Sequence, residues 1–197
     1  MAPRETLNAS MRSRAGHPEI LGETYAKFEF FEKNWNPYSR FLDIDKVDLI
    51  LRRRVAGQII YREIQVKFGK LYKCGSKWEQ KLFDYTSWRF FKEDEFKHYV
   101  DQKDLFVAYV LSRDPTPDAP GYQGDIFIFP VRMFDKVIRS SIQSGDGRRK
   151  VYLSRIKDEK KKWHLRCQGR AFTEIIEGET CMDVSQYWRN FDILEPH

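Results

Sequence analysis

A predicted β-hairpin in the N-terminal third of the chain constrains the fold most. Asp45–Arg54 and Ile59–Phe68 have the composition of strands, and Ala56-Gly57 between them is typical of a tight turn. Successive side chains of a strand point to opposite faces, so the second strand has one apolar and one polar face. The polar face carries Glu63, Gln65 and Lys67.

Asp48 is the unusual residue of this hairpin, because it lies within an otherwise apolar run, Val47–Leu51. The tight turn places Asp48 directly opposite Gln65. Glu63 and Lys67 then lie on the diagonals. An acid in an apolar run needs a bound cation or hydrogen-bonding partners, so the pattern predicts that these four polar side chains converge on one patch.

Carboxylate, amide and ammonium groups in this arrangement suit metal-assisted cleavage of a phosphodiester. Carboxylate and amide oxygens can hold Mg²⁺ or Mn²⁺, and a lysine ammonium can position water or stabilise the charge that develops on the phosphate. The alternative for Glu63, Gln65 and Lys67 is the solvated face of an amphipathic strand. Asp48 favours the catalytic interpretation, because solvation alone does not call for an acid at that position.

The remaining pattern predicts an α/β domain with a mixed central sheet flanked by helices. Apolar residues at three- and four-residue steps predict a first helix from Pro18 to about Asn34–Pro37. The uninterrupted apolar run of Asp104–Leu111 predicts a central strand that is buried on both faces. The other expected elements are a helix within Leu82–Tyr99, a strand at Asp125–Pro130, a short helix at Met133–Ser140, a hairpin of Lys150–Ile156 with Lys162–Cys167, and a closing helix at Val184–Phe191.

Three short motifs carry a resemblance to a known family. They are Gly22-Glu-Thr-Tyr-Ala26 on the first helix and, on the two hairpin strands, Asp45-Lys-Val-Asp48-Leu-Ile and Glu63-Ile-Gln65-Val-Lys67. Together they resemble the core of the PD-(D/E)XK nuclease superfamily, and the Gln-x-Lys form is similar to that of Mrr-like restriction nucleases. The resemblance implies a restriction-endonuclease-like αβββαβ core with a mixed central sheet, to which this chain adds a C-terminal β-hairpin and helix.

The resemblance also implies a site for Mg²⁺ or Mn²⁺ in a DNA endonuclease. Asp48 would be the principal metal ligand, Gln65 the second, Lys67 the catalytic lysine and Glu23 the carboxylate of the helix. Gln65 stands where the family usually has an acid, and an amide oxygen binds a hard cation more weakly than a carboxylate. Either Glu23 or Glu63 supplies the missing charge, or the chain is an inactive module of nuclease fold that binds nucleic acid or a partner.

Basic residues around the hairpin favour a polyanionic partner. The net charge is +6, with 35 Lys and Arg against 29 Asp and Glu, and the pI is about 9.1. We expect the contacts to DNA to come from Arg52, Arg53, Arg54, Lys70, Lys73 and Lys77. RNA stays open as a substrate, and so does a homodimer, because cutting both strands of a duplex takes two sites. Restriction or DNA processing in a mobile element is the expected setting.

The chain divides into a polar lead-in (1–16), a nuclease-like core (17–140) and accessory elements on the same domain (141–197). No apolar stretch approaches the roughly 20 residues that span a bilayer, and the N-terminus lacks the apolar segment of a secretory signal. The sequence therefore predicts a cytoplasmic protein without a membrane partner. Three widely spaced cysteines indicate neither a disulfide framework nor a zinc site.

Overall fold

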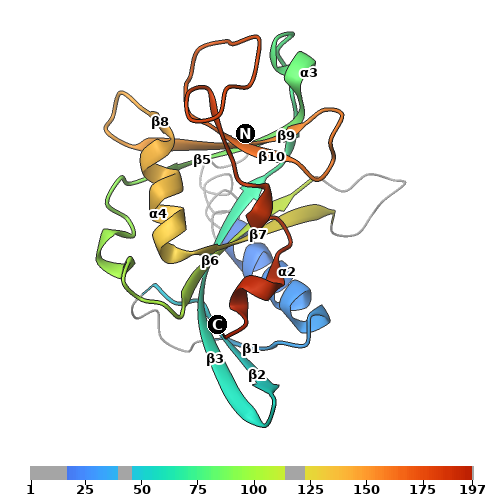
Figure 1. The fold of residues 1–197 in the computed structure, drawn as a ribbon, viewed down its shortest axis with the longest axis vertical. Coiled ribbons are helices and arrows are strands. Elements are labelled where there is room, and N and C mark those ends of the chain that lie inside the picture. The colour runs from blue at the N-terminus through green and yellow to red at the C-terminus, as the bar shows by residue number, and fades with distance from the viewer. Residues whose placement is uncertain (1–16, 40–45, 114–122, 197) are drawn as a thin grey trace, which may run out of the picture.

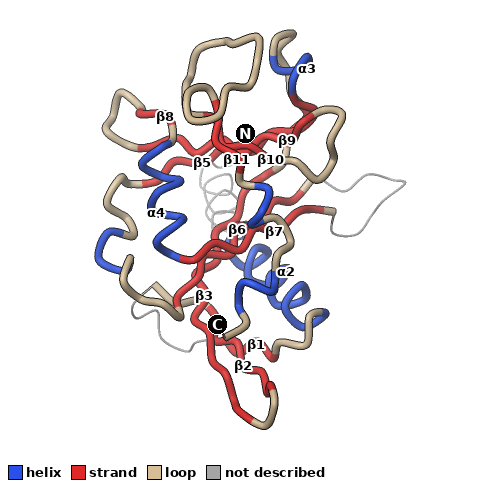
Figure 2. Tube along the Cα trace, viewed as in Figure 1, coloured by secondary structure: helices blue, strands red, loops and turns tan. Residues whose placement is uncertain are grey.

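The computed structural model describes residues 17–39, 46–113 and 123–196, and within these ranges the strands form two sheets (Figures 1 and 2). The first has the order β1-β2-β3-β6-β7: β1 (Asn36–Ser39), β2 (Leu49–Val55), β3 (Gln58–Lys70), β6 (Leu105–Ser112) and β7 (Gly124–Pro130). The second has the order β11-β10-β9-β5-β4, with β8 beside β9: β4 (Tyr72–Lys73), β5 (Phe83–Phe91), β8 (Ile142–Gln143), β9 (Arg149–Ile156), β10 (Trp163–Arg166) and β11 (Cys181–Asp183).

The α-helices are α2 (His17–Glu32), α3 (Glu79–Leu82) and α4 (Val131–Ser140), and the 3-10 helices are η1 (Lys97–Tyr99), η2 (Ser185–Tyr187) and η3 (Phe191–Leu194). The predicted first helix is confirmed as α2, and the predicted short helix as α4. In the described ranges, no helix combines the length and the apolar character needed to cross a membrane.

The predicted hairpin is confirmed as β2 and β3, which project from the body of the molecule (Figure 1). Ala56 and Gly57 both have positive φ angles, 49° and 85°, as the tight hairpin turns that match strand twist require. The pairing runs from Val55 opposite Gln58 to Leu49 opposite Ile64. One step further the Asp48 amide donates to the Ile64 carbonyl at 2.9 Å, so Asp48 lies beside Gln65 as the turn predicts.

The first sheet is mixed, as predicted. β3 pairs in parallel with β6, and β6 pairs in antiparallel with β7. Residues 105–111 of β6 are all buried, which confirms this run as a central strand. Its faces pack against two clusters: one includes Ala26 and Phe30 of α2, and the other includes Phe134 of α4 and residues of the second sheet. The chain therefore has an α/β fold with a mixed sheet.

Helix α2 approaches β3 closely at Gly22. A Cβ atom at this position would lie 2.7 Å from the Cβ atom of Phe68, closer than side chains normally pack. Only glycine lets the helix lie this near the strand. The glycine of the Gly-Glu motif thus places the first turns of α2 beside the polar end of the hairpin.

The predicted helix within Leu82–Tyr99 is wrong for most of its length, because residues 83–91 form strand β5 and only η1 is helical. Aromatic and β-branched side chains favour a half-buried strand, and β5 finds a long partner in β9. The connection between the parallel strands β3 and β6 consequently runs through a strand of the second sheet. It does not contain the long helix that an αβββαβ order places there.

The C-terminal part contributes β8 to β11 to the second sheet. The predicted hairpin is confirmed as β9 and β10, in which Leu153 faces Leu165. The predicted closing helix at Val184–Phe191 is wrong, since η2 and η3 flank a non-helical segment. There the Arg189 amide donates to the Ile126 carbonyl of β7 at 2.8 Å, and Arg189 has a φ of 49°. Pairing with the edge of β7 replaces the hydrogen bonds that a helix would make.

Candidate phosphodiesterase site

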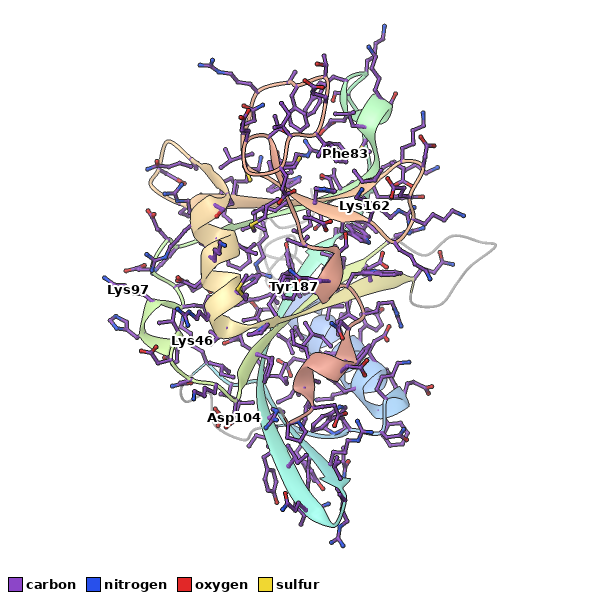
Figure 3. The ribbon with its side chains drawn as sticks, in the orientation of Figure 1. Lys46, Phe83, Lys97, Asp104, Lys162 and Tyr187 are labelled. Carbon is purple, nitrogen blue, oxygen red and sulfur yellow. The ribbon has the colours of Figure 1, made fainter. Side chains whose placement is uncertain are left out.

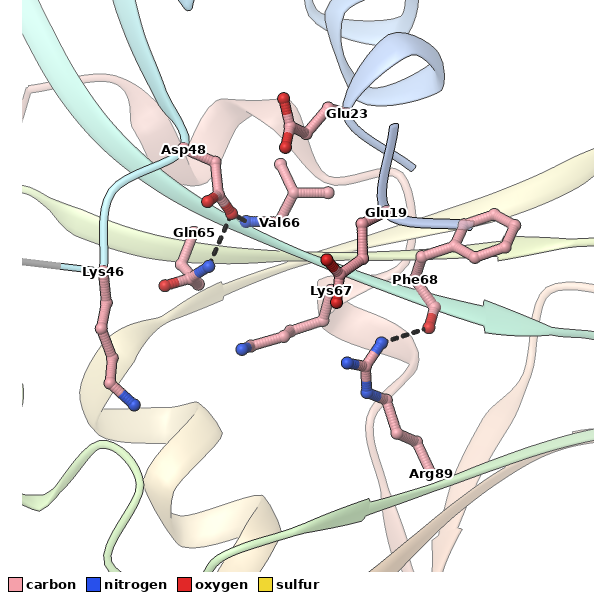
Figure 4. A pocket seen from close by; sticks show the side chains of 9 residues that line it. All are labelled: Glu19, Glu23, Lys46, Asp48, Gln65, Val66, Lys67, Phe68 and Arg89. Carbon is pink, nitrogen blue, oxygen red and sulfur yellow. Dashed lines mark hydrogen bonds between the residues drawn. The ribbon is translucent and has the colours of Figure 1, made fainter. Parts of the chain in front are cut away.

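A pocket of about 280 Å³ lies where the hairpin meets helix α2 and strand β5 (Figure 4). Its lining brings together four of the five residues predicted from the sequence to be catalytic. The lining residues are Glu19, Glu23, Lys46, Asp48, Gln65, Val66, Lys67, Phe68 and Arg89. Besides Asp48 and Gln65, the lining contains two glutamates, two lysines and an arginine, so the pocket is strongly polar.

Asp48 and Gln65 are joined directly. The side-chain amide nitrogen of Gln65 donates to Asp48 Oδ2 at 2.6 Å, and the backbone amide of Val66 donates to the same oxygen at 2.6 Å. These two bonds satisfy a half-buried carboxylate and fix its orientation. They also turn the amide nitrogen of Gln65 toward Asp48 and its carbonyl oxygen away from it (Figure 4).

Lys67 is held by a residue that the sequence did not indicate. Its Nζ atom lies 2.9 Å from Glu95 Oε1, and the side chains of both residues are only 14–16% exposed. Lys46 Nζ donates to the backbone carbonyl of Glu95 at 3.1 Å. Both ammonium groups also lie over the ring of Phe96, at 5.6 and 5.5 Å from its centroid. The segment before η1 therefore holds both lysines of the pocket.

Helix α2 contributes two carboxylates, Glu19 and Glu23, from successive turns of one face. Glu23 was predicted as the helix carboxylate of the site, and the structure places it in the pocket lining with Asp48. Glu19, which the sequence analysis did not single out, also lines the pocket, and its carboxylate lies on the side of Lys67 (Figure 4).

Arg89 enters the pocket from the second sheet, and the sequence analysis missed it. Its guanidinium donates to the backbone carbonyl of Phe68 at 2.7 Å, which ties β5 to the strand that carries Lys67. The helical prediction for this segment hid its role, because only the alternation of a strand turns Arg89 toward the first sheet while Trp88 points outward.

Glu63 is not part of this pocket. It lies on the same face of β3 as Gln65, but it lines a separate depression with Tyr61 and the segment 102–105. Two residues along a strand amount to roughly 6–7 Å, which is enough to separate the two sites. Asp45, the other aspartate of the motif that contains Asp48, falls outside the described residues.

The three arginines of the hairpin point to different faces. Arg52 and Arg54 pair with Tyr61 and Ile59, on the face that continues from Asp48. Arg53 lies on the opposite face, where it pairs with Glu195 and lies over the ring of Trp35. Arg53 therefore has a structural role, whereas its two neighbours extend the polar face of the hairpin.

The lysines expected to contact DNA do not line the pocket. Lys70 ends β3, Lys73 lies in β4, and Lys77 precedes α3. All three are exposed. They lie along the chain that leads from the pocket to the second sheet, and the basic surface they form is separate from the pocket lining.

Oxygen atoms of Asp48, Gln65 and Glu23 are the candidates for holding a divalent cation. No group of three His, Cys, Asp or Glu residues placed to share one metal ion occurs within 17–39, 46–113 and 123–196. The donor set matches Mg²⁺ by chemical type, since it consists of carboxylates and an amide. Coordination by Gln65 would require its amide to turn, because its nitrogen now faces Asp48.

Comparison of this chain with protein-family models, with curated proteins and with solved structures finds no match.

Proposed function

We propose that the protein is a metal-dependent endonuclease that hydrolyses phosphodiester bonds of DNA. The observation that carries the proposal is the convergence of Asp48, Gln65 and Lys67 in one polar pocket, with Glu23 beside them. Gln65 and Lys67 lie in β3, Asp48 directly precedes β2, and Glu23 lies in α2. The convergence fits the resemblance of the three sequence motifs to the PD-(D/E)XK nucleases.

The acidic side of the pocket is suited to a divalent cation. Asp48 and Glu23 would hold it with the amide oxygen of Gln65, and Glu19 adds negative charge nearby. When bound, Mg²⁺ or Mn²⁺ would neutralise the charge of the phosphate and activate water. Asp48 is already oriented by two short hydrogen bonds, so little reorganisation of this ligand is needed.

The basic side of the pocket is suited to the phosphate. Lys67 and Lys46 present ammonium groups, and Arg89 presents a guanidinium. Lys67 is a compact charge that can stabilise the additional negative charge of the transition state, and it must exchange Glu95 for phosphate to do so. Arg52 and Arg54, on the same face of the hairpin, extend this surface for the backbone of the substrate.

A cleavage assay on plasmid and linear DNA with Mg²⁺ or Mn²⁺ tests the proposal. We expect Asp48→Asn and Lys67→Ala each to lower the rate by on the order of 10²–10³. Lys161→Ala, at an exposed position of the C-terminal part, is the matched control and should cut like the wild type. Unchanged cleavage in Asp48→Asn or Lys67→Ala would show that this pocket is not the site. A comparison of DNA with RNA substrates tests the choice of nucleic acid.

A second candidate is a nuclease-fold module that binds nucleic acid without cutting it. Gln65 favours this candidate, because its amide nitrogen donates to the carboxylate of Asp48 that would bind the metal. Its amide oxygen carries no charge and is a weaker ligand than a carboxylate. Titration with Mg²⁺ or Mn²⁺ separates the two candidates. Metal binding by the wild type that Asp48→Asn abolishes supports the endonuclease, whereas salt-sensitive DNA affinity without metal binding supports the module.

The remaining expectations belong to the same proposal. Cutting both strands of a duplex takes two sites, so we propose that the endonuclease acts as a homodimer in restriction or in mobile-element processing. The molecular mass in solution, measured with and without DNA, tests the homodimer.

A further inference from the structure

The outer face of the second sheet carries aromatic side chains beside a lysine. β5 and β9 are antiparallel neighbours, with Trp88 opposite Tyr152 and Phe90 opposite Lys150. Ser87 and Val151, the neighbours of Trp88 and Tyr152 along their strands, are buried against the core. Alternation therefore turns one set of side chains outward. We call this set the aromatic strip: Trp88, Phe90, Lys150 and Tyr152.

Cations lie against the rings of the aromatic strip. Lys150 Nζ lies 4.4 Å from the ring centroid of Trp88, 4.6 Å from that of Tyr152 and 5.4 Å from that of Phe90. The Arg148 guanidinium lies 4.5 Å from the ring of Phe90. Within the described residues, Lys150 makes no ion pair with a carboxylate. Its charge is therefore available to an anionic ligand.

A pocket of about 350 Å³ adjoins the aromatic strip, with Lys150 and Tyr152 in its lining. Its floor includes Arg166, whose side chain is 5% exposed and pairs with Glu79 at 2.6 Å. The guanidinium of Arg166 also lies 4.9 Å from the ring of Tyr152. Among the described residues that line this pocket, Glu79 is the one acid, and it is already paired with Arg166.

An exposed tryptophan indicates what could bind here. Trp88 is 42% exposed, whereas Phe83, Phe91 and Trp163 of the same sheet are buried. Unpaired bases stack on such rings, and each phosphate between them needs a cation nearby. A duplex hides the faces of its bases, so it cannot use the rings in this way. An exposed ring with a cation beside it therefore matches a single strand.

We propose that the aromatic strip binds single-stranded nucleic acid, with a base stacked on the exposed ring of Trp88 and a phosphate beside Lys150. The strip lies on the opposite face of β5 from Arg89, which enters the candidate phosphodiesterase site. It is therefore a second binding surface and does not depend on cleavage. In Figure 3 the second sheet lies near the Phe83 label, and the hairpin extends from the opposite part of the molecule, below the Asp104 label.

Fluorescence anisotropy with labelled oligo(dT) and oligo(rU) in EDTA tests the proposal without any contribution from metal. Trp88→Leu keeps an apolar side chain but removes the ring, and it should weaken binding about tenfold, whereas Trp88→Phe should bind within about threefold of the wild type. Lys150→Ala should reduce the log–log salt slope by about 0.7, the value for one phosphate of a single strand. The comparison of the two oligonucleotides identifies the preferred nucleic acid.

Two matched controls use residues far from the strip. Phe28→Leu removes a ring that is 66% exposed on α2, and Lys161→Ala removes an exposed charge. Both should bind oligo(dT) like the wild type. Equal affinity of Trp88→Leu and the wild type overturns the proposal. So does a wild type that binds neither oligonucleotide, an outcome that would assign the strip to a protein partner. An equal loss of duplex affinity in Trp88→Leu also overturns it, because stacking requires unpaired bases.

Discussion

The ammonium nitrogen of Lys67 lies 2.9 Å from Glu95 Oε1, so the lysine expected to act on phosphate is held by a carboxylate from another segment. Both side chains are largely buried, and the backbone carbonyl of Glu95 also accepts a hydrogen bond from Lys46. A phosphate that enters the pocket must compete with Glu95 for Lys67. Glu95 therefore orients the lysine in the free protein and opposes the binding of an anion.

Glu95→Gln should increase the affinity for DNA. The substitution removes one negative charge beside Lys67 but leaves the hydrogen bond from Lys46 to the backbone carbonyl of residue 95. We expect about fivefold tighter binding at low salt and a smaller gain at high salt, because salt screens the interaction. Binding is measured with Ca²⁺ in place of Mg²⁺. Glu93→Gln is the control, since Glu93 pairs with Arg149 outside the pocket. An equal gain in both variants would contradict a specific competition for Lys67.

Gln65→Glu should make the stability of the protein depend on divalent metal. The new carboxylate would lie where the amide now donates to Asp48 at 2.6 Å, so two like charges would meet. Without metal we expect the free energy of unfolding to fall by about 1–2 kcal/mol. Mg²⁺ or Mn²⁺ should recover this loss and stabilise the variant more than the wild type. Thermal unfolding with and without metal measures both effects.

Gln58→Glu provides the control for that experiment, because Gln58 is exposed at the tip of the same hairpin. If metal shifts the unfolding of Gln58→Glu as much as that of Gln65→Glu, the cation does not bind between Asp48 and residue 65.

Gly22→Ala should weaken both stability and cleavage. The added methyl group would meet Phe68 at 2.7 Å and push α2, with Glu19 and Glu23, away from β3. Overpacking of this kind costs about 1–3 kcal/mol, which urea unfolding measures. Gly75→Ala is the control, since no heavy atom lies within 4 Å of its Cβ position. Wild-type stability in Gly22→Ala would show that α2 can move without cost.

The acidic half of the site could be predicted from the sequence because its geometry is local. A turn at Ala56-Gly57 fixes the pairing of the hairpin, and the pairing fixes Asp48 beside Gln65. The Gly-Glu motif on α2 supplied Glu23 by resemblance. These relations need only the alternation of a strand and the position of one turn.

Lys67 was predicted in the same way, but its partner Glu95 and the neighbouring Arg89 were not, because both come from the segment for which a helix was expected. Aromatic residues at three- and four-residue steps are compatible with a helix, and the same residues also suit a strand. β9 decides between the two states, because it pairs with every residue of β5 except Asp84, and these partners lie about 60–70 residues further along the chain. A contact of that sequence separation leaves no local pattern.

His164 should make stability fall on mild acidification. Burial lowers the pKa of its imidazole below the usual 6.5, and the carboxylates of Asp183 and Glu177 only partly offset this. The folded state therefore keeps His164 neutral at a pH where the unfolded chain takes up a proton. The stabilisation is complete above the unfolded pKa and is lost as the pH falls through 6.5, by at most about 1.4 kcal/mol per pH unit. Urea unfolding between neutral and mildly acidic pH measures the slope. His164→Gln should flatten it, and an unchanged slope would assign the pH dependence to other groups.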